Sequence, residues 1–406
     1  MKTLQQREIM KQFVIILLGV FAVYGVIWCV TGVYPWSHTS YNSYTLQAKA
    51  WLEGRLDLGQ NYEYLELAIF NGKYYVSFPP FPSYIFFVLG LIFQSFNFDG
   101  FVALLSTLVG AWYVLRLLHA MKKNNPVFWT LFLMIAQNLV FVSSNGWVWF
   151  IAQNLSFTLS IMAIYYAYKG AGGFSFFFWA CSVGCRPFQV IYFPFLVYLV
   201  FKQYKKENPS ATFFGMAKSK YYWAIPTFLV AFSYMVLNYA RFGSITEFGH
   251  NYLPEFVNAE NGQFHISYIF QNWVNLFRLY THGANGEIEY CKFNGMALFV
   301  PMPIYISYVW YLLYYKWKRS LKDYPLLWIH MATMLVHILL TLSHKTLGGW
   351  QFGNRYFIDL LPYVFFVFLY ATKDENDPLE QWQLPLFIFG IVVNVVGAIV
   401  TYNNWV

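Results

Sequence analysis

The stretch Phe13–Tyr34 reads FVIILLGVFAVYGVIWCVTGVY and decides the fold class. Its 22 residues include no charged side chain, and about 20 apolar residues are enough for a helix to cross a bilayer. The short basic segment Met1–Gln12 precedes it, and no small-residue cleavage site follows, which argues against a signal peptide. We therefore expect a retained membrane-spanning helix whose N-terminus is cytoplasmic.

The same apolar character extends over the whole chain. Of the 406 residues, 58% are hydrophobic and only 11% are charged, whereas about a quarter of the residues in a soluble domain are charged. This composition predicts an all-α polytopic membrane protein, a single transmembrane domain over residues 1–406 with about 11 helices. The expected spans are Phe13–Tyr34, Pro82–Phe96, Phe101–Leu118, Pro126–Val142, Trp147–Tyr168, Phe174–Phe201, Tyr222–Tyr239, Ala297–Tyr315, Pro325–Leu342, Asp359–Thr372 and Leu384–Tyr402.

Two features leave the number of spans open. Phe174–Phe201 is long for one helix and contains Arg186-Pro187, so a break there would add a crossing. A count of about 11 also places Lys122 and Lys123 outside, against the cytoplasmic bias of lysine and arginine. The sequence is therefore compatible with roughly 10 to 13 spans.

The net charge of +8 does not indicate a nucleic-acid partner. Basic residues form short runs that follow apolar segments, such as Lys202, Lys205 and Lys206, and this is typical of cytoplasmic loops. The four cysteines have neither the spacing of a metal site nor that of a disulfide framework.

Two long connections, residues 35–82 and 241–296, are expected on the extracytoplasmic side. The first carries Glu53, Asp57, Glu63 and Glu66, which are four of only 18 acidic residues in the chain. A simple connector has no need of such a concentration of charge, and loops on a rigid scaffold often hold binding and catalytic groups. We therefore expect the active site on this side of the membrane.

The first connection also has a readable local structure. Ser43–Leu56 has the pattern of an amphipathic helix in the membrane interface, with Trp51 at head-group depth. Asn71-Gly72-Lys73 predicts a tight turn between two strand-like pieces. The prolines of Pro79–Pro82 are expected to delay the next helix until Ser83.

A family resemblance rests on motifs that follow one another along nearly the whole chain. In the first connection these are GRLDL at 54–58, the Glu66-Leu67-Ala68 step, NGKYY at 71–75 and a Pro-Pro segment opening the next span. The later motifs are Cys185-Arg186-Pro187, NYARFG at 238–243 and GGWQFGNRY at 348–356. This ordered set resembles the GT-C superfamily of polytopic glycosyltransferases. Its members use polyprenyl-phosphate-linked sugars and include protein-mannosyltransferase-like and aminoarabinose-transferase-like branches.

The resemblance implies that an acidic residue of the first connection acts as general base or positions the acceptor. Glu66 is the best match. Asp57 and Glu63 are rivals, because Ser40–Ser43 lacks the early acidic residue that some members carry. A base must come within about 3 Å of the attacking hydroxyl.

Transfer from a lipid-phosphate sugar also requires cationic groups on the phosphate, where negative charge develops. Arg186 lies within an apolar run, and an ionisable group at membrane depth indicates function. Arg355 follows a glycine-rich loop that allows a ligand to approach the backbone closely. The full set of expected donor or phosphate contacts is Lys73, Arg186, Arg241, His250, Lys345 and Arg355.

Structural roles compete for several of these residues. Asp57 could cap a turn, and Glu53 with Arg55 could form the solvated face of an interfacial helix. Arg355 could form an i, i+4 ion pair with Asp359.

The expected function is an inverting glycosyl transfer in the cell membrane, from a polyprenyl-phosphate sugar to a glycan, lipid or protein acceptor of the cell envelope. No metal-ligand set and no cofactor are expected, and a divalent-metal requirement stays open. The alternatives are a transporter or lipid flippase, a ligase or polymerase of lipid-linked glycans, and a non-catalytic scaffold. A bacterial cytoplasmic membrane fits the resemblance better than an endoplasmic reticulum.

Overall fold

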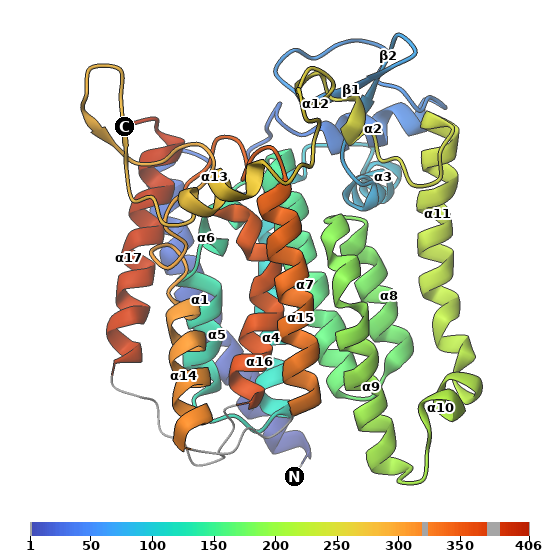
Figure 1. Cartoon of the computed structure of the whole chain (residues 1–406), viewed down its shortest axis with the longest axis vertical. Helices are drawn as coiled ribbons and strands as arrows, with labels where there is room; N and C mark the ends of the chain where they lie inside the picture. Colours follow the sequence, from blue (N-terminus) through green and yellow to red (C-terminus); the bar gives the residue numbers. More distant parts are fainter. Residues whose placement is uncertain (1, 319–323, 372–381, 406) are drawn as a thin grey trace.

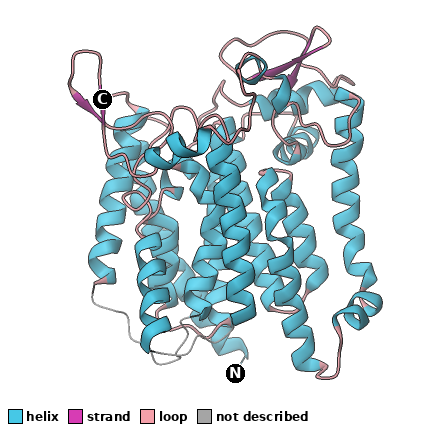
Figure 2. Ribbon diagram, in the orientation of Figure 1, coloured by secondary structure: helices cyan, strands magenta, loops and turns pink. Residues whose placement is uncertain are grey.

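The computed structural model describes residues 2–318, 324–371 and 382–405. Most of the described chain is helical, and long helices run side by side along one axis (Figures 1 and 2). Within these described ranges, six helices are long and apolar enough to cross a membrane, which makes the chain a polytopic all-α membrane protein. They are α1 (Lys2–Thr31), α4 (Asp99–Ala120), α7 (Val148–Tyr168), α11 (Ala224–Phe242), α15 (Tyr324–Ser343) and α17 (Gln383–Tyr402).

Shorter helices complete the bundle. Those that run along the same axis are α5 (Pro126–Ile135), α6 (Leu139–Ser143), α8 (Gly172–Val183), α9 (Phe193–Glu207), α14 (Ile304–Lys318) and α16 (Leu361–Ala371). The connecting pieces include α10 (Phe213–Ser219) and the 3₁₀ turns η1 (Pro187–Tyr192), η2 (Tyr221–Trp223), η3 (His250–Tyr252) and η4 (Arg355–Leu360).

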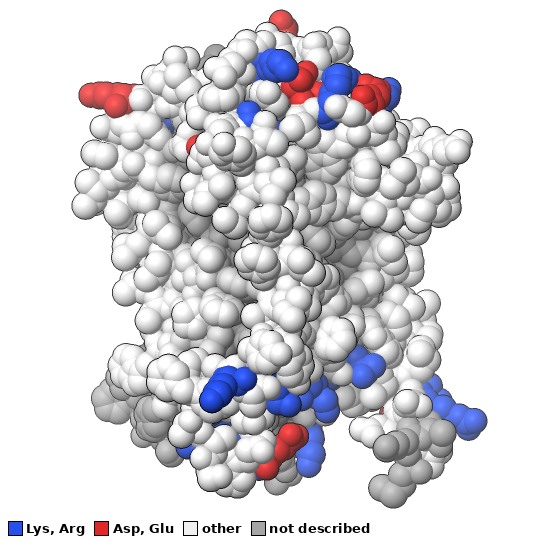
Figure 3. Space-filling model, turned by 90° about the vertical axis from the view of Figure 1, so that its right-hand side faces the viewer, with Lys and Arg blue, Asp and Glu red and all other residues white. Residues whose placement is uncertain are grey.

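The surface of the bundle has the charge distribution expected of a membrane protein. On the face shown in Figure 3, lysine, arginine and acidic side chains gather at the two ends, and a broad band between them carries other residues. Within the bundle, α7 is almost entirely buried and packs against α4 and α8, so it forms the centre of the core. The chain ends lie at opposite ends of the bundle (Figure 1).

The helix α3 (Phe81–Phe93) departs from the span expected at Pro82–Phe96. It lies across the bundle axis and is seen end-on in Figure 1. Its 13 residues rise about 20 Å, which is less than the roughly 30 Å of a bilayer core. It begins at Phe81, earlier than the expected Ser83, because the first turn of a helix tolerates proline.

The course of α4 explains the anomaly at Lys122 and Lys123. Because α3 does not traverse the bundle, α4 ends beside the start of α1, where His119 Nε2 lies 2.8 Å from Gln12 Oε1. The two lysines follow α4 directly and therefore lie at the same end of the molecule as the N-terminus.

The expected span Phe174–Phe201 is broken into α8 and α9, as Arg186-Pro187 suggested. Gly184 ends α8, Arg186 is extended (φ −139°, ψ 105°), and Pro187 opens η1. A residue before proline avoids the helical conformation, so the chain turns back here. The rings of Trp179 and Phe193 lie 4.5 Å apart and pack the two helices together.

A layer of short elements covers the bundle at the end opposite the N-terminus (Figure 1). It comprises α2 (Ser43–Leu52), β1 (Leu67–Phe70), β2 (Lys73–Val76), α12 (Pro254–Val257), α13 (Tyr268–Asn275), β3 (Thr281–His282) and β4 (Ile288–Glu289). The connections 35–82 and 241–296 therefore lie on the same side of the bundle.

The structure confirms the tight turn and the helix predicted in the first connection. Strands β1 and β2 pair with Leu67 opposite Val76, and Asn71 and Gly72 both have positive φ, as a tight two-residue turn requires. The helix α2 is confirmed but ends at Leu52, before Gly54 (φ +73°), instead of continuing to Leu56. Its Trp51 packs against the aromatic rings of α3.

Candidate functional site

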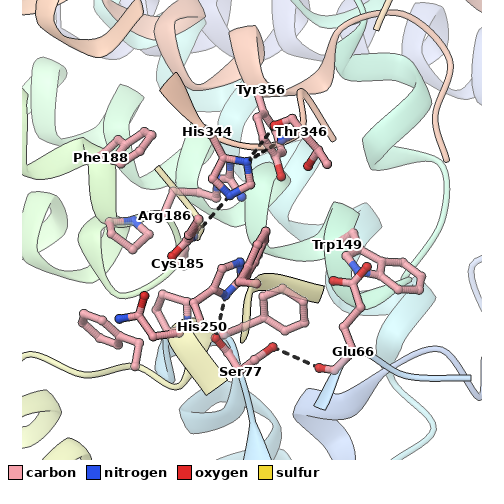
Figure 4. Close-up of a pocket in the computed structure, with 18 of the residues that line it drawn as sticks. Glu66, Ser77, Trp149, Cys185, Arg186, Phe188, His250, His344, Thr346 and Tyr356 are labelled. Carbon is pink, nitrogen blue, oxygen red and sulfur yellow. Dashed lines mark hydrogen bonds between the residues drawn. The ribbon is translucent and has the colours of Figure 1, made fainter. Parts of the chain in front are cut away.

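A cavity of about 280 Å³ lies between the bundle and the covering layer (Figure 4). Five segments far apart in the sequence line it: the first connection, the start of α7, the turn after α8, the second connection and residues 341–359. Glu66 and Arg355 face this same cavity. The charged and imidazole side chains in its lining are Glu66, Arg186, Glu247, His250, Glu255, His344, Arg355 and Asp359.

The wall nearest the bundle is built around two arginines and one carboxylate. Arg186 Nε donates to Asp359 Oδ2 over 2.8 Å, and Asp359 is only 2% exposed. The guanidinium carbons of Arg186 and Arg355 each lie 5.0 Å from the centre of the Tyr356 ring. This distance is within the range of cation–π attraction. Two cations facing one anion give this wall a positive excess.

Local sequence places Arg186 in the cavity. Because α8 ends at Gly184 and Pro187 prevents its continuation, the Arg186 side chain leaves the helix instead of facing lipid. Gly184 is needed at this point, because a Cβ atom there would lie 2.0 Å from the Tyr234 hydroxyl oxygen. The Gly184 carbonyl accepts a bond from the Phe81 amide over 2.9 Å, which ties the turn to the start of α3.

Arg355 is held by contacts with the central helix. Its NH1 donates to the Trp149 carbonyl over 3.3 Å, and its own carbonyl accepts from Gln153 Nε2 over 2.8 Å. Its Nε has no hydrogen-bond partner among the described residues, although it is buried. Burial lowers the pKa of the Arg355 guanidinium. An anionic ligand would restore both the missing hydrogen bond and the counter-charge.

Three further carboxylates line the cavity: Glu66, Glu247 and Glu255. The Glu66 backbone carbonyl accepts from Ser77 Oγ over 2.9 Å, which fixes its position just before β1, while its side chain reaches the cavity beside Trp149 (Figure 4). Burial raises the pKa of Glu255, and the negative charge of Glu66 adds to the effect. The charge of Glu66 also acts on Arg355. The charge of Glu66 therefore acts both on Glu255 and on Arg355.

Two histidines line the cavity in their neutral form. His250 Nδ1 donates to the Ser77 carbonyl over 2.9 Å, and burial lowers its pKa. Its Nε2 is then an acceptor, so His250 supplies a proton-accepting lone pair instead of the phosphate-binding charge expected of it. His344 Nδ1 donates to the Thr346 carbonyl over 2.7 Å, and burial lowers its pKa to about 4.

The two rival acids do not line the cavity. Asp57 Oδ1 accepts from the Gly59 amide over 2.9 Å, and its other oxygen lies 3.4 Å from Lys73 Nζ. Asp57 therefore caps a turn. Lys73 forms an ion pair with Asp57 and does not line the cavity. Glu63 is exposed on the surface of the first connection.

Two of the expected phosphate contacts have structural partners instead. Arg241 is 3% exposed and donates to the Val76 carbonyl over 3.1 Å, which pins α11 to the β-hairpin. Lys345 Nζ donates to the Glu255 carbonyl over 2.8 Å. Neither side chain lines the cavity.

The alternative structural role of Arg355, an i, i+4 ion pair with Asp359, is not found. These residues belong to the 3₁₀ turn η4, in which residues three apart eclipse and residues four apart diverge. Asp359 pairs with Arg186 instead.

Sequence reasoning missed Glu247 and Glu255 as cavity residues. Glu247 Oε1 accepts from the Gly249 amide over 2.6 Å and Oε2 accepts from Asn251 Nδ2 over 2.7 Å, so the carboxylate organises the turn that presents His250. The only signal in the sequence was the position of both acids in a long polar connection. No group of three or more His, Cys, Asp or Glu side chains suited to a metal ion occurs in the described ranges.

Comparison with known proteins adds no identification, because no family model, curated protein or solved structure matches the chain.

Proposed function

We propose that this protein is an integral membrane glycosyltransferase of GT-C type, which moves a sugar from a polyprenyl-phosphate donor to an acceptor at the membrane surface. One observation carries the proposal: Glu66 and the two arginines Arg186 and Arg355 line a single cavity. A base and a phosphate-binding group in one cavity are what transfer from a lipid phosphate needs.

In this proposal Glu66 takes the proton of the acceptor hydroxyl as its oxygen attacks the anomeric carbon. The bond from that carbon to the phosphate oxygen breaks, and Arg186 and Arg355 bind the departing phosphate. Direct displacement inverts the anomeric configuration. His250 Nε2 lies in the same cavity and is the second group able to accept the proton.

The proposed topology has eleven crossings and two sizeable loops on the extracytoplasmic side, residues 35–82 and 241–296. The crossings are α1, α4, α5 with α6, α7, α8, α9, α11, α14, α15, α16 and α17. Basic residues near the N-terminal end of the bundle support a cytoplasmic N-terminus and an extracytoplasmic cavity (Figure 3). A cavity at this depth would receive the phosphate of a lipid whose chain remains in the bilayer.

Binding of polyprenyl phosphate to the purified protein tests the proposal, measured by native mass spectrometry from mixed micelles. We expect a bound lipid that is weakened at least tenfold in Arg355→Gln, because a charge-assisted hydrogen bond to an ionised group contributes about 1.5–3 kcal/mol. Lys73→Gln is the matched control, since Lys73 pairs with Asp57 outside the cavity. Equal binding by the Arg355→Gln variant and the wild type would remove the phosphate site from the proposal.

A transporter or lipid flippase is the second candidate, and one observation favours it. His330 and His337 of α15 are completely buried within the bundle, and both nitrogens of His330 lack a partner among the described residues. Ionisable groups at such depth often lie on a transport route. Movement of a fluorescent polyprenyl-phosphate analogue across proteoliposomes, abolished by His330→Phe, would favour this function over glycosyl transfer.

A further inference from the structure

Helix α13 has the reverse of the pattern expected of a helix in an aqueous loop. Its asparagines Asn272 and Asn275 are buried, with 3% and 6% of their surface exposed. Phe270 and Trp273, by contrast, are 77% and 50% exposed. A surface helix normally turns its apolar side chains inward and its polar side chains to water. The outward face of α13 is therefore apolar.

Hydrogen bonds fix this orientation. Asn272 Nδ2 donates to the carbonyl of Leu342 over 2.9 Å and to that of His344 over 2.7 Å, both at the end of α15. Rolling the helix to bury its aromatic face would break both bonds and leave two carbonyls unpaired. Each buried unpaired polar group costs about 1–3 kcal/mol.

The exposed apolar face is a continuous stripe. At about 100° per residue, Phe270, Trp273 and Val274 of α13 fall within a sector roughly 100° wide, opposite the buried asparagines. Ile266 and Phe277, in the turns on either side of the helix, are also exposed and extend this stripe.

The stripe continues the lipid-facing surface of the bundle. α13 packs on α15, whose Leu335, Val336 and Leu339 are themselves exposed. It also lies across the end of the bundle, nearly perpendicular to α15 (Figure 1). This is the orientation of a helix lying in the plane of a membrane interface.

We propose that α13 is a membrane-surface helix whose apolar stripe inserts into the leaflet at the cavity end of the protein. The segment preceding it pairs with the end of α15, where the His265 amide donates to the Ser343 carbonyl over 2.8 Å. Phe264, next to it, lines the cavity together with His344. Lipid contact at α13 therefore sets the depth of this cavity wall in the membrane. The proposal does not depend on the reaction performed.

Spin-label accessibility tests the insertion. In a Cys29→Ser background, Phe270→Cys and Trp273→Cys are labelled with a nitroxide and reconstituted into vesicles of phosphatidylethanolamine and phosphatidylglycerol. Gln271→Cys is the matched control, because Gln271 is exposed on the same helix outside the stripe. Labelling of the parent protein gives the background from the three remaining cysteines, which are buried.

We expect collisions with oxygen to exceed those with a water-soluble nickel chelate at positions 270 and 273, and the ratio to be reversed at position 271. A chelate-dominated signal at all three positions would place α13 in water and overturn the proposal. Low accessibility to both reagents at 270 and 273 would mean that a second copy covers the stripe, which also overturns it.

The unmodified protein provides a second measurement, in case a cysteine variant fails to fold. A phospholipid with a photoactivatable group at the top of its acyl chain should crosslink to residues 266–277 as well as to α15. Crosslinks on α15 without any on 266–277 would contradict insertion.

Discussion

The ion pair between Arg186 and Asp359 makes the sharpest prediction about stability. The two side chains meet over 2.8 Å, and 20% of Arg186 and 2% of Asp359 remain exposed. Asp359→Asn removes the only hydrogen-bonded counter-charge of Arg186 among the described residues, while Arg355 remains in the same cavity. Breaking one partner of a buried pair costs about 3–5 kcal/mol. Because Arg186 keeps some contact with solvent, we expect about 3 kcal/mol.

A double-mutant cycle in detergent micelles measures this coupling. Thermal unfolding is compared for the wild type, Asp359→Asn, Arg186→Gln and the double variant. Each single change should lower the melting temperature by several degrees, because each leaves one group without its partner. The double variant should be more stable than the sum of the two single effects predicts, by an interaction energy of about 1–3 kcal/mol.

Strict additivity of the two effects would refute the reasoning. It would mean that Arg186 and Asp359 do not interact and that the basic wall is organised in some other way. Glu63→Gln serves as the control for a change of charge, since Glu63 is exposed away from the cavity, and it should alter the melting temperature very little.

Three further predictions concern stability and use the same melting assay. Burial lowers the pKa of His344 from 6.5 to about 4, so the folded state loses stability as the pH falls from 6.5 to 4, by roughly 3 kcal/mol in total. His344→Asn should flatten this pH dependence of the melting temperature. An unchanged profile would mean that His344 is not buried in its neutral form. Gly184→Ala should cost about 1–3 kcal/mol, because the new Cβ would overlap the Tyr234 hydroxyl; wild-type melting would show that the turn has room. Arg241→Leu should cost about 1–3 kcal/mol, because the Val76 carbonyl loses its donor, and the absence of any loss would mean that Arg241 does not pin the hairpin.

The membrane class of the fold could be predicted from composition, but the course of individual segments could not. Hydropathy alone does not distinguish an apolar helix that crosses a membrane from one that lies across its end, and α3 is of the second kind. The break at Arg186-Pro187 was readable, because proline acts through local backbone geometry. One expected crossing is lost because α3 lies across the end of the bundle, and one is gained because the span expected at Phe174–Phe201 forms two helices. The proposed number of crossings is therefore still eleven.

For the candidate site, the sequence likewise indicated some of the residues but not their local partners. The family resemblance pointed to Glu66 as the base and to Arg186 and Arg355 among the phosphate contacts, and these three residues line one cavity. The sequence could not tell which of several charged residues would be occupied by local partners. Asp57 is held by its own turn and Arg241 by a backbone carbonyl. The partner of Asp359 depended on η4 being a 3₁₀ turn, which no residue pattern indicated.

The central claim, that Glu66 acts on a phosphate-linked sugar held by the arginines, has one direct test. Membranes containing the wild type, Glu66→Gln or Glu63→Gln are incubated with labelled hexose and pentose donors on polyprenyl phosphate, and sugar transfer to membrane acceptors is counted. We expect transfer by the wild type and by Glu63→Gln. Glu66→Gln should lose about 10²–10⁴-fold in rate while still binding polyprenyl phosphate. Transfer by Glu66→Gln at the wild-type rate, or no transfer from any donor by the wild type, would contradict the account.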